Sequence, residues 1–177
     1  MKLDAQGWFS GVRRVVSPNF DVRPSHTPIS LLIIHSISLP PNEFGGDGVR
    51  RLFTNTLDTE AHPYYEQLKG VKVSAHFFIR RNGEVVQFVS CHCRAWHAGA
   101  SLWGGRVRCN DFSIGIELEG SDFVPFADAQ YCSLAYLTRR LRRNYQLHDI
   151  VGHSDVAPER KTDPGPHFDW PRYLNSL

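Results

Sequence analysis

Three residues of metal-binding types stand in separate parts of this 177-residue chain. His35 follows an apolar run at residues 31–34, His153 follows a second short apolar segment, and Asp163 lies just before Pro164. Each alone is ordinary for a hydrogen-bonded histidine at a sheet rim or an aspartate in a turn. Together they form the two-histidine, one-carboxylate set of catalytic zinc sites, which leaves a position for water and can lower its pKa to about 7. That chemistry suits amide hydrolysis.

Amide hydrolysis also needs a base for the water and a group that stabilises the oxyanion. Glu117 and Glu119 share the polar face of an alternating segment, so either carboxylate can serve as the base, and alternation alone does not choose between them. A solvated sheet face is the structural alternative for both. Lys161 precedes Asp163 by two residues, so an extended backbone places both side chains on one side. An exposed loop lysine is the alternative for Lys161.

The elements that must position these residues are mostly strands. Residues 28–35 predict a strand buried on both faces, and the alternation over residues 112–119 predicts another. Residues 75–80 and 84–89 flank an Asn-Gly pair and predict a β-hairpin.

A long helix capped by Asp128 is indicated by apolar residues at three- and four-residue spacing up to Tyr145. A short helix is expected around residues 49–53, inside an excursion at residues 39–70, and little regular structure is expected at residues 157–171. We predict one α/β domain over residues 1–177, with a central mixed β-sheet flanked by helices.

Composition excludes several functions. The net charge of +2 disfavours nucleic acid and anionic membranes as partners. No apolar run is long enough to span a bilayer or to act as a signal peptide, so the expected location is the cytoplasm. The four cysteines lack the spacing of a zinc knuckle, and we expect buried or unreactive thiols.

The segments that carry this chemistry closely resemble the bacterial N-acetyl-anhydromuramyl-L-alanine amidases of the AmpD type, within the wider amidase and peptidoglycan-recognition-protein superfamily. The resemblance runs nearly end to end. It rests on PNFDVRP (residues 18–24), ISLPP (37–41), EFGG (43–46), VSAH (73–76), AWHAG (95–99), RCNDFSIGIELEG (108–120) and RKTDPGP (160–166).

The resemblance implies one Zn²⁺ per chain held by His35, His153 and Asp163, with Glu117 as the general base and Lys161 stabilising the transition state. It implies cleavage between the lactyl group of 1,6-anhydro-N-acetylmuramic acid and L-alanine in cytosolic peptidoglycan recycling, with an indirect effect on β-lactamase induction through muropeptide levels. We expect a monomer that takes anhydromuramyl-peptides.

The resemblance also implies substrate contacts. Trp96 and Arg108 are expected to hold the anhydro-sugar, and Asn110 to supply polar contacts, although Trp96 in the core and Arg108 on the surface are the alternatives. Two residues depart from the family pattern. Ser36 replaces an expected asparagine, and Lys72 replaces an arginine expected to face the stem-peptide carboxylate, which keeps the charge but loses the bidentate fork.

Two other functions share these features. A non-catalytic peptidoglycan-binding module has typically lost a metal ligand, and this sequence retains all three. An exported enzyme or phage lysin that attacks intact wall usually carries a signal or a wall-binding module, and we expect neither here.

Overall fold

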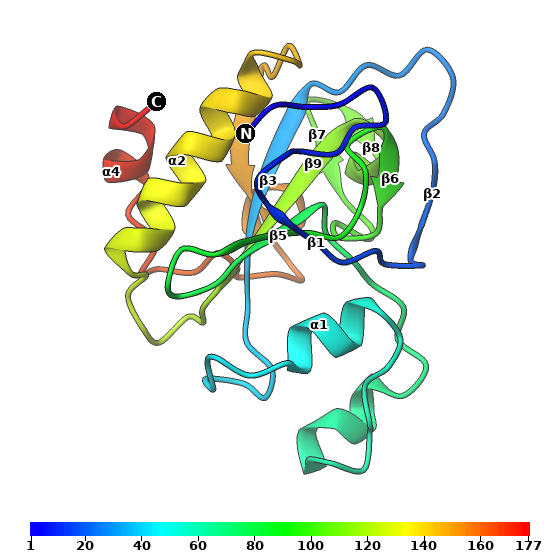
Figure 1. The fold of residues 1–177 in the computed structure, drawn as a ribbon, viewed down its shortest axis with the longest axis vertical. Coiled ribbons are helices and arrows are strands. Elements are labelled where there is room, and N and C mark those ends of the chain that lie inside the picture. Colours follow the sequence, from blue (N-terminus) through cyan, green and yellow to red (C-terminus); the bar gives the residue numbers. More distant parts are fainter.

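The computed structural model describes residues 1–177 and is built around a six-stranded mixed sheet in the order β1-β5-β4-β9-β3-β10 (Figure 1). Its strands are β1 (Arg13–Arg14), β3 (Leu31–Ile37), β4 (Phe77–Ile79), β5 (Val85–Gln87), β9 (Ser113–Glu119) and β10 (Asp149–Gly152). Two small pairs lie beside it: β2 (Phe20–Val22) with β6 (Cys93–Ala95), and β7 (Leu102–Trp103) with β8 (Arg106–Val107). The helices are α1 (Gly48–Phe53), α2 (Asp128–Arg142), α3 (His153–Val156) and α4 (Trp170–Asn175), with 3₁₀ helices η1 (Pro63–Leu68) and η2 (Cys109–Asp111).

The centre of the sheet is parallel. β3 lies between β9 and β10 and pairs with both in parallel, while β4 pairs in parallel with β9 and antiparallel with β5. Parallel strands at the centre of a sheet are covered on both faces, which explains the unbroken apolar run of β3. The predicted mixed α/β architecture is confirmed, and so is the hairpin that joins β4 to β5.

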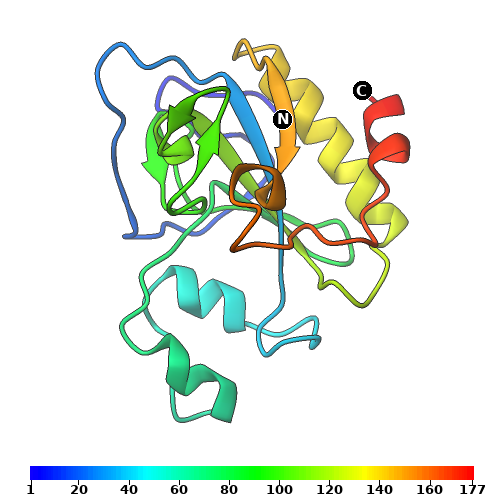
Figure 2. The ribbon, with the colours of Figure 1, turned by 180° about the vertical axis from the view of Figure 1, so that it is seen from behind.

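Alternation along the strands separates two cores. Leu32 and Ile34 of β3, with Ile114 and Ile116 of β9, pack with the apolar stripe of α2. Figure 1 shows α2 and α4 side by side on this face. The odd-numbered residues of β3 face the other way, toward α3, which lies in front of the sheet in Figure 2. His35 is the next odd-numbered residue, so it lies on the α3 face.

A long excursion, residues 38–76, leaves the sheet after β3 and returns at β4. It carries α1 and η1 away from the sheet, as the lower part of Figure 1 shows. Leu52 and Phe53 of α1 pack against Phe78 of β4 and Phe88, which fixes the excursion to the edge of the main domain. Gly48 allows the close approach of α1, since a Cβ there would lie 2.2 Å from the Leu39 carbonyl oxygen.

Several details differ from the sequence-based predictions. β3 continues two residues beyond His35. Asp128 is the first residue of α2 rather than its cap: the Ala127 N–H instead donates to Gln130 Oε1 at 3.0 Å. The tail is irregular up to Asp169, and α4 follows.

The four thiols are all free, but only Cys91 and Cys109 are buried, while Cys132 is exposed. None of the helices combines the length and apolar character that crossing a bilayer requires.

Candidate active site

Three side chains converge on one point at the α3 face of the sheet. His35 Nδ1 lies 3.0 Å from His153 Nδ1 and 3.1 Å from Asp163 Oδ2, and His153 Nδ1 lies 3.0 Å from the same oxygen. Zinc–ligand bonds of about 2.0–2.1 Å at tetrahedral angles place neighbouring ligand atoms about 3.3 Å apart. The nearly equilateral triangle therefore has the size and the donor set of a three-ligand zinc site.

Three different elements bring these ligands together. His35 comes from the central strand β3, and His153 is the first residue of α3, directly after the neighbouring strand β10. Asp163 lies in the loop that follows α3, and its carbonyl oxygen accepts a hydrogen bond from the Ser154 N–H at 2.9 Å. This bond holds the loop against the start of α3 and so positions the Asp163 carboxylate beside the two imidazoles.

The ionisation of His35 and of Asp163 favours the binding of a metal cation. Burial lowers the pKa of His35 to about 4, which leaves its imidazole neutral at pH 7. Burial raises the pKa of Asp163, but hydrogen bonds with His153 and His35 outweigh that effect and hold the pKa below its ordinary value. Neutral imidazoles beside an ionised carboxylate are the forms in which these side chains bind metals.

Glu117 and Glu119 have different environments despite sharing one face of β9. Both are buried, so the solvated alternative is wrong for each. The Glu119 carboxylate accepts two backbone hydrogen bonds, from Gly45 N at 2.6 Å and from Arg81 N at 2.8 Å. Oε2 of Glu117 has no hydrogen-bond partner. Glu119 thus anchors two loops, whereas Glu117 keeps a free oxygen.

The carboxyl group of Glu117 is tuned by its surroundings. Burial raises its pKa well above the ordinary value, the Asp163 charge raises it further, and the Lys161 ammonium lowers it. An upward shift in its pKa makes the ionised form of a carboxyl group a stronger base, which suits it to accept and return a proton.

A cavity of about 290 Å³ opens beside these groups. Its polar floor includes Glu117, His153, Asp163 and Lys161. Apolar side chains of the excursion form an apolar wall: Leu39, Leu52, Phe53, Tyr64, Leu68, Val71 and Val73. Trp96 and Ser36 also line the cavity, so a substrate here would meet an aromatic side chain, a hydroxyl, the Lys161 ammonium and two of the three triangle residues together.

The other three predicted contact residues lie elsewhere. Lys72 lines a neighbouring hollow that shares Leu52, Leu68 and Val71 with the cavity wall. Arg108 is exposed and pairs with Asp111 at 2.7 Å, outside the cavity. Asn110 is also absent from the cavity lining, and its Oδ1 accepts hydrogen bonds from the backbone at residues 97 and 98.

Sequence reasoning missed His97. This buried side chain lines the cavity, and its Nδ1 lies 2.9 Å from Nε2 of His35. The available signal was its position next to Trp96 in the AWHAG segment. The length of the excursion is typical of a binding loop, but the sequence did not identify which of its residues form the apolar wall, since they are spread over 35 positions from Leu39 to Val73.

Known proteins are similar to this chain in sequence and in architecture. The N-acetylmuramoyl-L-alanine amidase family model matches residues 25–166. The 1,6-anhydro-N-acetylmuramyl-L-alanine amidase AmpD of Escherichia coli is 55% identical over 95% of this chain and 93% of its own, and AmpD of Haemophilus influenzae is 51% identical over 97% and 95%.

Solved structures agree. A crystal structure of a selenomethionine derivative of AmpD superposes with a TM-score of 0.97 at 53% identity, covering 100% of this chain and 99% of that one. Escherichia coli AmiD, in complex with the substrate anhydro-N-acetylmuramic acid-L-Ala-D-γ-Glu-L-Lys, gives a TM-score of 0.61 at 31% identity over 86% of this chain and 59% of its own.

Proposed function

We propose, from the premise that this chain belongs to the N-acetylmuramoyl-L-alanine amidase family, that it hydrolyses the amide bond between the lactyl group of 1,6-anhydro-N-acetylmuramic acid and L-alanine. One observation carries the proposal: two members of the His35, His153 and Asp163 triangle, His153 and Asp163, line one cavity together with Glu117, whose Oε2 has no hydrogen-bond partner. The relatives named for this reaction support the same substrate.

His35, His153 and Asp163 are the residues that would hold Zn²⁺. When bound, such an ion supplies a Lewis acid for the scissile carbonyl and makes water a stronger acid. The ligand charges sum to −1, so the site keeps a net positive charge that favours a polarised carbonyl oxygen. A histidine that binds a metal does so as a neutral imidazole.

Glu117 is the proposed general base. Its free Oε2 can accept a proton from the attacking water and later deliver it to the leaving amine of L-alanine. Glu119 cannot take this part without giving up its hydrogen bonds to Gly45 and Arg81. This difference favours Glu117 where the alternation of β9 left both carboxylates open.

Lys161 and Trp96 complete the proposed site. The Lys161 ammonium lies near enough to lower the pKa values of both Glu117 and His35, so its charge reaches the region where an oxyanion would form. The ring of Trp96 offers an apolar face for the sugar, and Ser36 offers a hydroxyl for a polar contact. Lys72 lines the neighbouring hollow, and its ammonium is the proposed partner for a carboxylate of the stem peptide.

We propose that the enzyme acts on peptidoglycan fragments that are recycled in the cytoplasm. We also propose that it acts as a monomer. Removal of the peptide from such fragments would lower muropeptide levels and so act indirectly on β-lactamase induction. A preference for soluble anhydromuramyl-peptides over purified sacculi is the corresponding biochemical expectation. Similar rates on the two substrates would contradict it.

Mass spectrometry of the products tests the reaction directly. A purified anhydromuramyl-tripeptide is incubated with the enzyme, with and without a chelator, and a Glu117→Gln variant serves as the matched control. The expected products are the free tripeptide with an L-alanine amino terminus and 1,6-anhydro-N-acetylmuramic acid, formed only without the chelator. Cleavage at a different bond, or full activity after complete metal removal, would overturn the proposal.

A further inference from the structure

The outer nitrogens of the two ligand histidines contact two consecutive residues, His97 and Ala98. Nε2 of His35 lies 2.9 Å from Nδ1 of His97, and Nε2 of His153 lies 3.2 Å from the carbonyl oxygen of Ala98. A ligand histidine commonly donates its second ring N–H to an outer partner, which fixes the ring and its tautomer. Here consecutive residues of one short segment provide both outer partners.

The tautomers follow from these contacts. A carbonyl oxygen only accepts, so Nε2 of His153 carries the proton and Nδ1 is left bare toward the triangle. For Nδ1 of His35 to bind a metal, its Nε2 must likewise donate, and Nδ1 of His97 must accept. His97 then carries its own proton on Nε2, which faces the hydroxyl of Ser113 at 3.3 Å.

The strand β9 is shaped to receive the His97 ring. A Cβ at Gly115 would lie 2.5 Å from the imidazole, so only glycine leaves room for it. Ser113 precedes Gly115 on the same face and meets the far nitrogen of the ring, while Glu117 follows it. The face of β9 that holds the proposed base therefore also seats His97.

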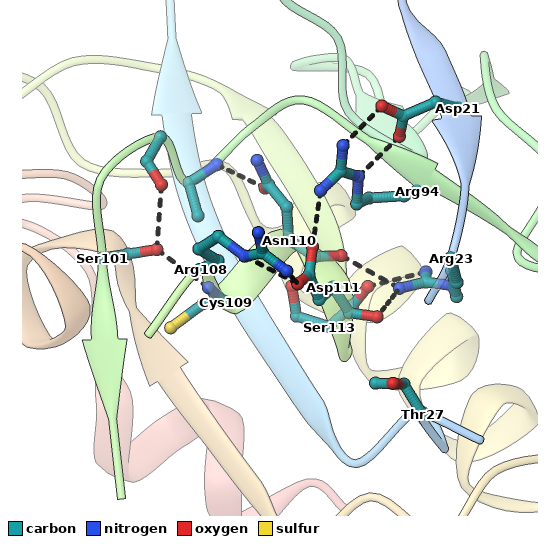
Figure 3. Close-up of polar contacts among 12 residues, drawn as sticks. Asp21, Arg23, Thr27, Arg94, Ser101, Arg108, Cys109, Asn110, Asp111 and Ser113 are labelled. Atoms are coloured by element: carbon teal, nitrogen blue, oxygen red, sulfur yellow. Dashed lines mark hydrogen bonds and ion pairs between the residues drawn. The ribbon is translucent and has the colours of Figure 1, made fainter. Parts of the chain in front are cut away.

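Asn110 fixes the segment from outside. Its Oδ1 accepts the N–H of His97 at 3.2 Å and the N–H of Ala98 at 2.8 Å. The neighbouring Asp111 is held in turn by Arg94, which also pairs with Asp21 (Figure 3). The amide oxygen of Asn110 is thus committed to the protein backbone, and it does not line the cavity.

We propose that residues 97–98 are the outer support of the metal centre, with His97 the positioning residue that holds His35 in its metal-binding tautomer and Asn110 the residue that fixes the segment. The inference rests on the proposed zinc amidase function. It gives Asn110 a different role from the substrate contact that the sequence resemblance implies.

Two substitutions of His97 separate its polar role from its volume. In His97→Asn the Oδ1 atom can stand where Nδ1 stood and accept the proton of His35, whereas His97→Leu fills similar space without an acceptor. Zinc affinity of the metal-free proteins is measured by competition with a chromophoric chelator. We expect His97→Leu to bind zinc about 10–100-fold more weakly than wild type, and His97→Asn to recover most of the difference.

The imidazole ¹⁵N shifts of the zinc-loaded proteins give a second readout. In the wild type the proton on Nε2 of His35 should be hydrogen-bonded to Nδ1 of His97, and in His97→Leu the ¹⁵N shift of this Nε2 should move because its acceptor is lost. Ser113→Ala removes only the hydroxyl at the end of the hydrogen-bonded series His35–His97–Ser113. It should change the ¹⁵N shifts of His97 without unfolding the protein. It serves as the alternative test if His97→Leu does not fold.

The outcomes distinguish the two proposals. A wild-type protein that binds no zinc would refute the proposed function before any variant is compared. Zinc binding by the wild type, with equal affinity in His97→Leu, would overturn the support role alone. Equal weakening in His97→Leu and His97→Asn would reduce His97 to a packing residue, and unchanged His97 shifts in Ser113→Ala would contradict the assigned proton chain.

Discussion

His35 and Glu117 are register partners on the neighbouring parallel strands β3 and β9. In-register residues of paired strands point to the same face of the sheet. The same backbone hydrogen bonds therefore set the separation between a proposed metal ligand and the proposed base. Both residues lie in the middle of the sheet, where strands are least able to shift, so this part of the site is formed in advance by the fold.

We expect close to one equivalent of zinc per chain in protein purified without chelators. The triangle of His35, His153 and Asp163 is the structural reason. In Asp163→Ala the equivalent should be lost along with activity. Zinc added back to metal-free wild type should raise the melting temperature, because ligand at 100 times its Kd stabilises by about 2.7 kcal/mol. Elemental analysis and thermal melts check both, and a melting temperature indifferent to zinc would contradict the assignment.

Glu117→Gln and Glu119→Gln should have opposite effects. Glu117→Gln should lower kcat by roughly 10²–10⁴-fold with zinc retained and stability unchanged or raised, because a buried carboxyl group without a full set of partners is replaced by an amide.

Glu119→Gln should retain most activity and lose about 1.5–3 kcal/mol of stability, since the charged acceptor for Gly45 and Arg81 is removed. Steady-state kinetics and urea unfolding measure the pair. Equal kinetic losses in both variants would show that the roles are assigned wrongly.

Lys161→Met should lower kcat more than it raises KM. An ammonium that stabilises an oxyanion acts mainly in the transition state, and loss of one such donor costs roughly 10²–10³-fold. Lys161→Arg should restore little, because a planar fork replaces a compact donor. Intact zinc content with unchanged kcat in Lys161→Met would leave the residue as a cavity-lining cation without a part in the reaction.

The metal-free protein should lose stability on mild acidification. Burial lowers the pKa of His35 to about 4 and lowers the pKa values of His76 and His97 as well, so below pH 6.5 the unfolded chain takes up protons that these residues refuse in the folded state. Each such histidine costs at most about 1.4 kcal/mol per pH unit between pH 6.5 and its folded pKa. The raised pKa of Glu117 acts in the opposite direction, since the folded state then binds the extra proton above pH 4.5.

The effect of Glu117 cancels that of one histidine, so the net loss of folding stability should approach the contribution of two histidines. This is about 3 kcal/mol per pH unit at most, between pH 6.5 and 4.5. Urea unfolding of chelated protein at several pH values measures it, and His97→Leu should show a shallower slope. Stability that stays flat or rises on acidification would contradict this account.

The sequence predicted the mixed sheet, the hairpin and the long helix, because each depends on a local pattern of apolar residues and turn residues. It did not predict the buried, anchoring position of Glu119, for which alternation left open a general base or a solvated face. β9 is instead covered on both sides, a fact that depends on residues far away in the chain, including Gly45 and Arg81. It also left His97 unassigned, since a histidine that supports a ligand has no spacing signature of its own.

The excursion between β3 and β4 has a consequence for engineering. Nearly all of the apolar wall of the cavity comes from this one uninterrupted stretch, whereas the polar floor comes from the sheet and the α3 loop. β3 and β4 both pair with β9, and the ends of the excursion lie two strand spacings apart and three residues apart along β9, so about 14 Å separates them. Residues 38–76 can therefore be exchanged as one cassette with the corresponding segment of a homologue, to transplant substrate preference while the proposed ligands and base stay in place.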